Sequence, residues 1–213
     1  MTDITVIGGT GYAGAAIVKE AVTRGHRVTS LSRSLPADRI DGATYVQGDA
    51  RDAADAIAGA QVVVGALSPR AGTEGTLVAT YTAIAEQAAA AGARLLIIGG
   101  FGSLRPAPGA PRFAEGDQMP PEVIVEAREV NSVLTALESG APVSLDWVFI
   151  SPAAVFGGYT PQGDPHGTYR TSTGIALFDE QGNSAIEGAD FALAVVDEIE
   201  KAEHHRSQLN FAY

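Results

Sequence analysis

The chain has 213 residues, of which 46% are hydrophobic and 18% charged, a composition typical of a globular domain with a sizeable core. Its formal charge is −11 and it has no cysteine, which argues against nucleic-acid binding and excludes disulfides, thiolate catalysis and cysteine-based metal sites. Neither a secretory segment nor a membrane-spanning apolar run stands out, so we expect a cytoplasmic protein without membrane association.

A buried strand over residues 4–7 leads directly into a glycine-rich turn, and a helix is predicted from about Tyr12. This order lets a backbone approach a pyrophosphate closely, and the new helix directs unpaired amides and its dipole toward the anion. A side chain at Gly8 or Gly11 would obstruct the turn or the phosphates, and one at Gly14 would push helix and strand apart. We interpret the segment as a dinucleotide-binding turn; the alternative is an ordinary tight turn. The predicted cofactor contacts here are Gly8, Thr10, Gly11, Tyr12, Ala13 and Gly14.

The second predicted strand, residues 27–31, delivers Ser32 and Arg33 to the carboxyl edge of the sheet. NAD-selective proteins carry at this place an acidic side chain that binds the ribose 2′-hydroxyl. A guanidinium flanked by serines suits a 2′-phosphate instead, because it forms paired charge-assisted hydrogen bonds. The sequence therefore predicts NADP(H) as the preferred cofactor and NAD(H) as the alternative. If Arg33 is instead a solvated loop residue without a phosphate partner, this preference has no basis.

The third and fourth predicted strands, residues 44–46 and 62–65, add further cofactor candidates. Asp49 follows the third strand, where it can accept a hydrogen bond from the adenine amino group, cap the next helix, or do both. The fourth strand is a continuous apolar run, as expected for a parallel strand covered on both faces. Leu67 and Ser68 follow it and are expected beside the cofactor's ribose.

A long helix with Tyr81 on its apolar stripe comes next, and we expect Tyr81 to be a core residue. The fifth strand, residues 95–98, opens into the predicted cofactor contacts Gly99 and Gly100 and then into Ser103. An irregular, proline-rich segment follows, and then a helix over 122–138 and a sixth strand over 146–150.

Residues 151–172 are predicted to form a long loop, and a loop of this length inside a compact domain is usually functional. Four aromatic side chains of this loop and of the proline-rich segment are expected to stack on a flat substrate or, alternatively, to anchor the loops. They are Phe113, Phe156, Tyr159 and Tyr169. His166 is either a proton donor or a solvated loop residue. His204 and His205 have no supporting ligand spacing, so no metal site is predicted.

A short strand over 175–178, a closing helix over 189–201 and a last edge strand over 209–211 complete the pattern. Strands alternating with helices predict an α/β fold with a doubly wound, mainly parallel, Rossmann-type sheet and helices on both faces. We expect residues 1–213 to form one nucleotide-binding domain, with 151–187 as a small substrate-side lobe.

The glycine turn, Arg33 and the pair Gly48-Asp49 resemble the short-chain dehydrogenase/reductase superfamily. Residues 97–104, 145–152 and 182–192 are similar to its atypical NAD(P)H-binding, NADH-flavin-reductase-like group, akin to biliverdin reductase B, and the likeness covers nearly the whole chain. The resemblance implies hydride transfer from NAD(P)H to a flat acceptor, such as FMN, FAD, a quinone or a tetrapyrrole. It also places Ser103 close to the superfamily's catalytic serine.

One departure from the superfamily pattern bears on the mechanism. Ordinary members use a Tyr-x-x-x-Lys pair, but Lys19 and Lys201, the only lysines here, follow Ala15 and Asp197 at that spacing. Conventional carbonyl or alcohol chemistry is therefore not expected. Flavin reduction needs no such pair, because the protein need only position two flat rings while the proton comes from solvent. Ser103 and His166 remain as candidate catalytic residues; the alternative for Ser103 is a turn hydroxyl.

The missing pair fits a second class of function equally well. Proteins of the NmrA type bind NADP without turnover and regulate through a partner protein. Isomerisation on a bound cofactor is the weakest alternative, since no general base is evident. The sequence leaves open the acceptor, the oligomeric state and whether residues 151–172 close as a lid.

Overall fold

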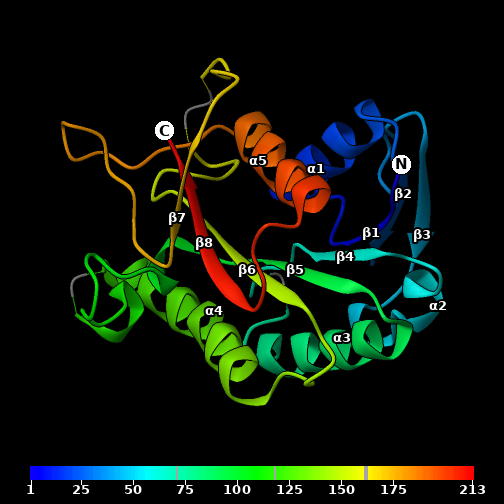
Figure 1. The fold of residues 1–213 in the computed structure, drawn as a ribbon, viewed down its shortest axis with the longest axis horizontal. Helices are drawn as coiled ribbons and strands as arrows, with labels where there is room; N and C mark the ends of the chain where they lie inside the picture. The colour runs from blue at the N-terminus through cyan, green and yellow to red at the C-terminus, as the bar shows by residue number, and fades with distance from the viewer. Residues whose placement is uncertain (71, 118, 161–162) are drawn as a thin grey trace.

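The computed structural model describes residues 1–70, 72–117, 119–160 and 163–213, which form one eight-stranded sheet covered by helices on both faces (Figure 1). The strands are β1 (Asp3–Ile7), β2 (Arg27–Ser32), β3 (Ala43–Gln47), β4 (Val62–Gly65), β5 (Arg94–Ile98), β6 (Trp147–Pro152), β7 (Arg170–Thr173) and β8 (Ser207–Ala212). The α-helices are α1 (Tyr12–Thr23), α2 (Ala54–Ile57), α3 (Leu77–Ala91), α4 (Pro121–Gly140) and α5 (Gly188–Lys201). Short 3₁₀ turns are η1 (Ala50–Asp52), η2 (Phe101–Ser103) and η3 (Phe113–Glu115).

The strand order is β3-β2-β1-β4-β5-β6-β8-β7, and every neighbouring pair is parallel except β7 with β8. From β1 the chain first builds β2 and β3 on one side and then β4, β5 and β6 on the other. The strand order therefore reverses between β1 and β4, where Ile7 pairs with both Leu31 and Gly65. The predicted doubly wound, mainly parallel sheet is confirmed.

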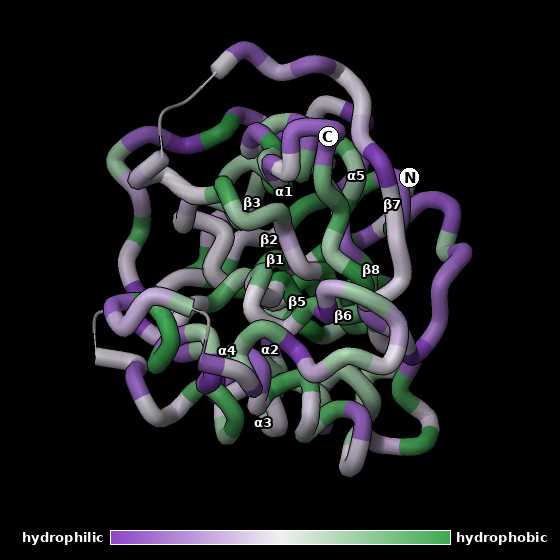
Figure 2. Tube along the Cα trace, turned by 90° about the vertical axis from the view of Figure 1, so that its left-hand side faces the viewer, coloured by the Kyte–Doolittle hydropathy of each residue, from purple (hydrophilic) through white to green (hydrophobic). Residues whose placement is uncertain are grey.

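The core has two layers because alternate residues of each strand face opposite sides of the sheet. Val6 and Val64 belong to the layer beneath α1 and α5, whereas Ile7 and Val63 belong to the layer facing α2, α3 and α4. Hydrophobic segments accordingly gather in the central strands, with hydrophilic segments around the rim (Figure 2). Full burial of such a side chain is worth about 1.5–3 kcal/mol. The continuous apolar runs of β4 and β6 thus follow from coverage on both faces.

Helices α1 and α5 pack against each other and are joined by a charged network. Arg24, the C-cap residue of α1, donates hydrogen bonds to Asp197 and Glu200 of α5, each over 2.7 Å. The Tyr169 hydroxyl, from the chain before β7, also donates to Asp197, over 2.6 Å. Asp197 therefore ties three segments together.

The single tryptophan, Trp147, lies at the other end of the sheet from the glycine turn, at the start of β6. Its side chain is buried, with 3% exposed, and the Arg206 guanidinium lies 6.0 Å from its ring centroid. Among the described residues, no helix is both long enough and apolar enough to cross a membrane.

Three predictions about the last third of the chain were wrong. Residues 175–178 form no strand; Ile175 makes only an isolated bridge with Arg105, and the additional strand is β7. The apolar residues of this segment pack singly, Leu177 against the core and Phe178 edge-on against Phe101. The real strand is polar because it lies exposed at the sheet edge. Residues 209–211, expected at the edge, lie inside the sheet, since β7 pairs outside β8. The predicted loop 151–172 loses both ends to strands β6 and β7, and its residues 161 and 162 lie outside the described part of the chain.

The helix predicted after Asp49 is also shorter than expected. Asp49 caps η1 rather than a long helix, and α2 contains only four residues. Residues 151–187, predicted to be a lobe, contribute β7 to the same sheet as the rest of the chain.

Candidate functional site

A cavity of about 370 Å³ opens at the carboxyl end of the sheet, where the strand order reverses. Parallel α/β sheets bind ligands at such a crevice. Its walls come from the turn after β1, the ends of β2 and β3, the loop after β4 and the start of α3. Eight predicted cofactor residues line it, namely Gly8, Thr10, Gly11, Ser32, Arg33, Asp49, Leu67 and Ser68.

The glycine turn forms one wall of this cavity, and its geometry explains two of its glycines. Gly8 has a φ of +84°, and its amide donates to the Leu31 carbonyl over 2.8 Å. A Cβ at Gly8 would collide with the Ala66 carbonyl, and one at Gly14 would collide with the carbonyl of Gly8. At Gly11 the nearest atom to a Cβ is 3.4 Å away, so the protein itself leaves room there. A side chain at Gly11 would therefore be expected to clash only with a bound ligand.

The remaining predicted cofactor residues are not part of the cavity lining. Tyr12, Ala13 and Gly14 form the first turn of α1, and Gly99 and Gly100 follow β5. A Cβ at Gly99 would collide with the ring of Phe149, so this glycine is required by core packing. Their roles in cofactor binding stay predictions.

Four polar side chains meet at the end of the cavity formed by β2 and β3: Ser32, Arg33, Asp49 and Arg51. Asp49 accepts a hydrogen bond from the Arg51 amide over 2.8 Å, which confirms a capping role. Its carboxylate also accepts from the Arg51 side chain, over 3.1 and 3.0 Å. Hydrogen bonds from Arg51 lower the pKa of Asp49 to about 2, so the carboxylate is ionised at neutral pH.

Leu67 and Arg70 shape the wall that follows β4. The Leu67 amide donates to the hydroxyl of Tyr81 over 3.0 Å, so Tyr81, a core residue as expected, also supports the cavity. Arg70 donates from Nε to Glu126 of α4 over 2.9 Å, and its guanidinium lies 5.4 Å from the ring centroid of Tyr159. Arg70 thereby connects the cavity wall to α4 and to the chain after β6.

The predicted aromatic substrate residues do not all lie together. Phe156 packs edge-on against Tyr12, with ring centroids 5.2 Å apart, and Tyr159 is 71% exposed next to Arg70. Phe113 stacks on Phe101 instead, with ring centroids 4.8 Å apart. Only Phe156 and Tyr159 therefore adjoin the glycine-turn helix or the cavity wall.

Three further candidates take part in packing elsewhere. Tyr169 donates its hydroxyl to Asp197 and packs edge-on against Phe211. Ser103 is fully buried, and its Oγ has no hydrogen-bond partner within the described part of the chain. The ring of His166 stacks on Tyr213 with centroids 3.9 Å apart. None of these three side chains lines the cavity, and their predicted roles remain untested predictions.

Asp190 anchors the segment 153–169, a role that the sequence pattern alone did not reveal. Its carboxylate is 2% exposed and accepts hydrogen bonds from the amides of His166 and Gly167 over 2.7 and 2.8 Å. The Tyr213 hydroxyl also donates to it. Asp190 thus joins this segment, the start of α5 and the residue after β8.

Other cavity residues were also missed from the sequence. They include Arg51, Arg70 and three threonines, Thr73, Thr76 and Thr80. The threonines recur at spacings of three and four, the period of a helix. This row of threonines at helical spacing, next to the apolar face of α3, could have indicated a polar wall of the cavity. No sequence pattern indicated Arg51 or Arg70, because long charged side chains are common in solvated turns.

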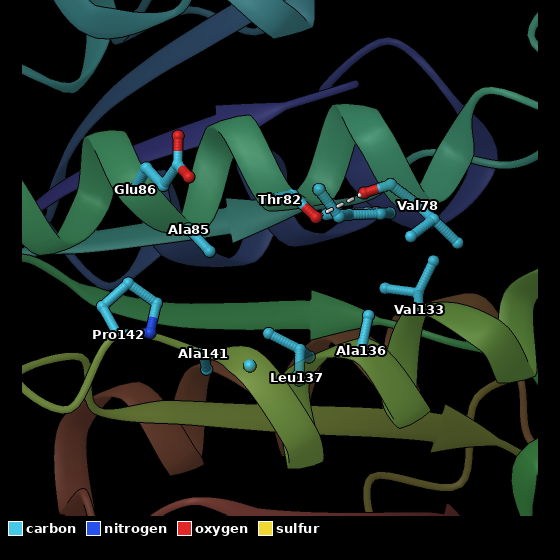
Figure 3. Close-up of a pocket in the computed structure, with 11 residues that line it drawn as sticks. Val78, Thr82, Ala85, Glu86, Val133, Ala136, Leu137, Ala141 and Pro142 are labelled. Atoms are coloured by element: carbon cyan, nitrogen blue, oxygen red, sulfur yellow. Dashed lines mark hydrogen bonds between the residues drawn. The ribbon is translucent and has the colours of Figure 1, made fainter.

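Two further hollows lie elsewhere. One, of about 60 Å³, lies between α3 and α4 and is lined mainly by apolar side chains such as Val78, Val133 and Leu137 (Figure 3). The other, of about 340 Å³, surrounds the Asp3–Arg27 ion pair at the opposite edge of the sheet. In the described ranges, no three histidine or acidic side chains are arranged to hold a metal ion.

Comparison with known proteins agrees with this geometry. Residues 8–202 match the model of a family described as NAD(P)H-binding. The uncharacterized protein YwnB of Bacillus subtilis (strain 168) is 33% identical over 204 residues, covering 94% of this chain and 93% of the relative.

The solved structures that match over the full length of the chain include the following two. A Burkholderia pseudomallei protein, provisionally named an exported protein, is 35% identical with a TM-score of 0.87 and is itself covered over 100% of its length. A Streptococcus pneumoniae protein, provisionally named an NADH-flavin reductase, is 30% identical with a TM-score of 0.88 and is covered over 99%. These matches agree with the resemblance inferred from the sequence.

Proposed function

The chain belongs to the NAD(P)H-binding family, and from this membership we propose that it is a cytoplasmic NAD(P)H-dependent reductase. Its acceptor is a flavin or a similarly flat molecule, such as a quinone or a tetrapyrrole, and NADP(H) is preferred over NAD(H). The observation that carries the proposal is the cavity of about 370 Å³ at the carboxyl end of the sheet, where Arg70 of the lining lies over an exposed aromatic ring, Tyr159.

The residues of the cavity fit a nicotinamide dinucleotide. The turn leaves room at Gly11, beside the start of α1, where a helix terminus stabilises a pyrophosphate. Ser32 is nine-tenths buried, lines the cavity and has no partner for its Oγ among the described residues, as expected of a group that bonds a ligand. When bound, the nicotinamide supplies the hydride.

The chain's own residues act by positioning. Lys201 is paired with Asp197 on α5 over 3.2 Å, and Lys19 is exposed on α1, so neither lysine lies beside the cavity. A carbonyl substrate would need a tyrosine made acidic by such a lysine, whereas a flavin accepts hydride directly and takes its proton from water. Phe156 and Tyr159 are the flat side chains placed to hold such a ring.

The proposal is tested by mixing the purified protein anaerobically with NADPH and, separately, FMN, FAD, riboflavin or a quinone. Loss of nicotinamide absorbance is followed against protein-free controls. We expect saturable acceleration with at least one acceptor, which also identifies the acceptor class. Tight NADPH binding without acceleration for any acceptor would contradict the reductase and favour the NmrA-type sensor.

A further inference from the structure

We propose that Arg51 and Asp49 together set the choice between NADP(H) and NAD(H). Arg51 is a second phosphate-binding cation beside Arg33, and Asp49 is the carboxylate that restrains it. This inference rests on the proposed function and adds to it two residues that tune cofactor selectivity.

The site is built from side chains that line one end of the same cavity. Ser32, Arg33, Asp49 and Arg51 come from the ends of β2 and β3 and from η1, which lie next to each other in the sheet. The buried Oγ of Ser32 has no protein partner in the described ranges. A buried hydroxyl without a partner points to a ligand group at this end of the cavity.

The backbone of Arg51 is fixed, while its side chain is free to change partner. Its amide donates to Asp49 over 2.8 Å, and its carbonyl accepts from Gln87 of α3 over 2.8 Å. The side chain is 64% exposed, and its hydrogen bonds to the described residues go to the Asp49 carboxylate. A guanidinium in this position can exchange a carboxylate for a phosphate without any movement of the backbone.

The charges at this end give the two residues opposite effects. Arg33 is close enough to Asp49 to lower the pKa of that carboxyl further, so one carboxylate lies among two guanidinium groups. A 2′-phosphate attracts both arginines and is repelled by the carboxylate. A ribose 2′-hydroxyl carries no charge, so the carboxylate does not repel it. Arg51 therefore favours NADP(H), and Asp49 favours NAD(H).

The test measures dissociation constants for NADPH and NADH from the fluorescence of the bound nicotinamide, without any acceptor. For Arg51→Gln we expect NADPH binding about tenfold weaker and NADH binding changed by less than about twofold, since one charged hydrogen bond is lost. For Asp49→Asn we expect tighter NADPH binding and little change in NADH binding, because the carboxylate repels only the charged 2′-phosphate. Arg27→Gln is the matched control, because Arg27 is similarly exposed (60% against 64% for Arg51) and is paired with Asp3 at the opposite end of the strands.

The possible failures are distinguishable. If the wild-type protein binds neither nucleotide, the proposed function and this inference both fall. If it binds NADPH but Arg51→Gln weakens both nucleotides equally, or Asp49→Asn weakens NADPH, the inference alone is overturned. Thermal melting of each variant shows whether it is folded, and Arg51→Lys, which keeps the charge, should restore part of the NADPH affinity.

Discussion

Three of the four glycines between residues 8 and 14 lack side chains for two distinct reasons. Gly8 and Gly14 are required by the protein, since a Cβ at either would meet a backbone carbonyl that cannot move aside. Gly11 lines the cavity and has room for a Cβ within the protein. Two variants at this turn therefore separate stability from binding.

We expect Gly14→Ala to destabilise the fold by about 1–3 kcal/mol, as overpacking does at well-packed positions. Gly11→Ala should leave the melting temperature nearly unchanged but weaken NADPH binding, because a methyl group in the cavity lining would obstruct a pyrophosphate bound there. Thermal melting and NADPH titration of both variants check this. An unchanged NADPH affinity in Gly11→Ala would show that the pyrophosphate does not approach this backbone.

Arg33 carries the predicted preference for NADP(H). Its side chain is exposed and lines the cavity, and its carbonyl is held by Gln47 over 3.0 Å. We expect Arg33→Ala to weaken NADPH binding by about tenfold or more and NADH binding much less. Arg39→Ala, in the same loop but outside the cavity lining, is the control. Equal losses for the two nucleotides would remove the argument for NADP(H).

At the scale of elements, the sequence predicted best where one local rule decides the structure. The strands β1, β4, β5 and β6 are apolar runs, and the turn at Gly8 follows from sterics within a few residues. The edge strand β7 was missed because pairing with β8 alone stabilises its polar residues, and that partner follows some 35 residues later in the chain. The roles of Asp190 and Arg51 likewise depend on partners or walls that only the fold brings together.

The segment 153–169 is held at its far end by Asp190. The Asp190 carboxylate accepts three hydrogen bonds, and in Asp190→Asn one of its two oxygens is replaced by an NH₂ group, which cannot accept. We therefore expect the free energy of unfolding to fall by about 1–3 kcal/mol. Limited proteolysis should show faster cleavage within 153–169. Asp179→Asn is the control, because Asp179 also caps local amides but is exposed. Equal cleavage rates within 153–169 in the two variants would show that Asp190 does not anchor the segment.

For the whole molecule, the contact between α1 and α5 makes stability depend on pH. Burial opposes ionisation of Asp197, but hydrogen bonds from Tyr169, Arg24 and Lys201 outweigh it and lower its pKa below 3.8. Because the folded pKa lies below the unfolded one, this contribution is present above about pH 4 and is lost as the pH falls through the folded pKa. Burial and the bond to Asp197 raise the pKa of Tyr169 above 10.0, so its contribution is lost in alkali.

We therefore expect a stability plateau around neutral pH, with a fall below about pH 4 and another above about pH 10. Asp197→Asn should lower the plateau and flatten the acid limb, because the titrating group is gone. Urea unfolding at several pH values measures both effects. An acid limb of unchanged steepness in Asp197→Asn would assign the acid sensitivity to other carboxylates.

The position of Trp147 gives the protein two separate optical signals. Its indole is buried at the start of β6, away from the cavity, and its Nε1 has no hydrogen-bond partner among the described residues. Its emission should therefore be blue-shifted in the folded protein and move to longer wavelength when the sheet comes apart. Nicotinamide emission, in contrast, arises only at the nucleotide. A single sample can thus report folding in one spectral band and occupancy of the cavity in another.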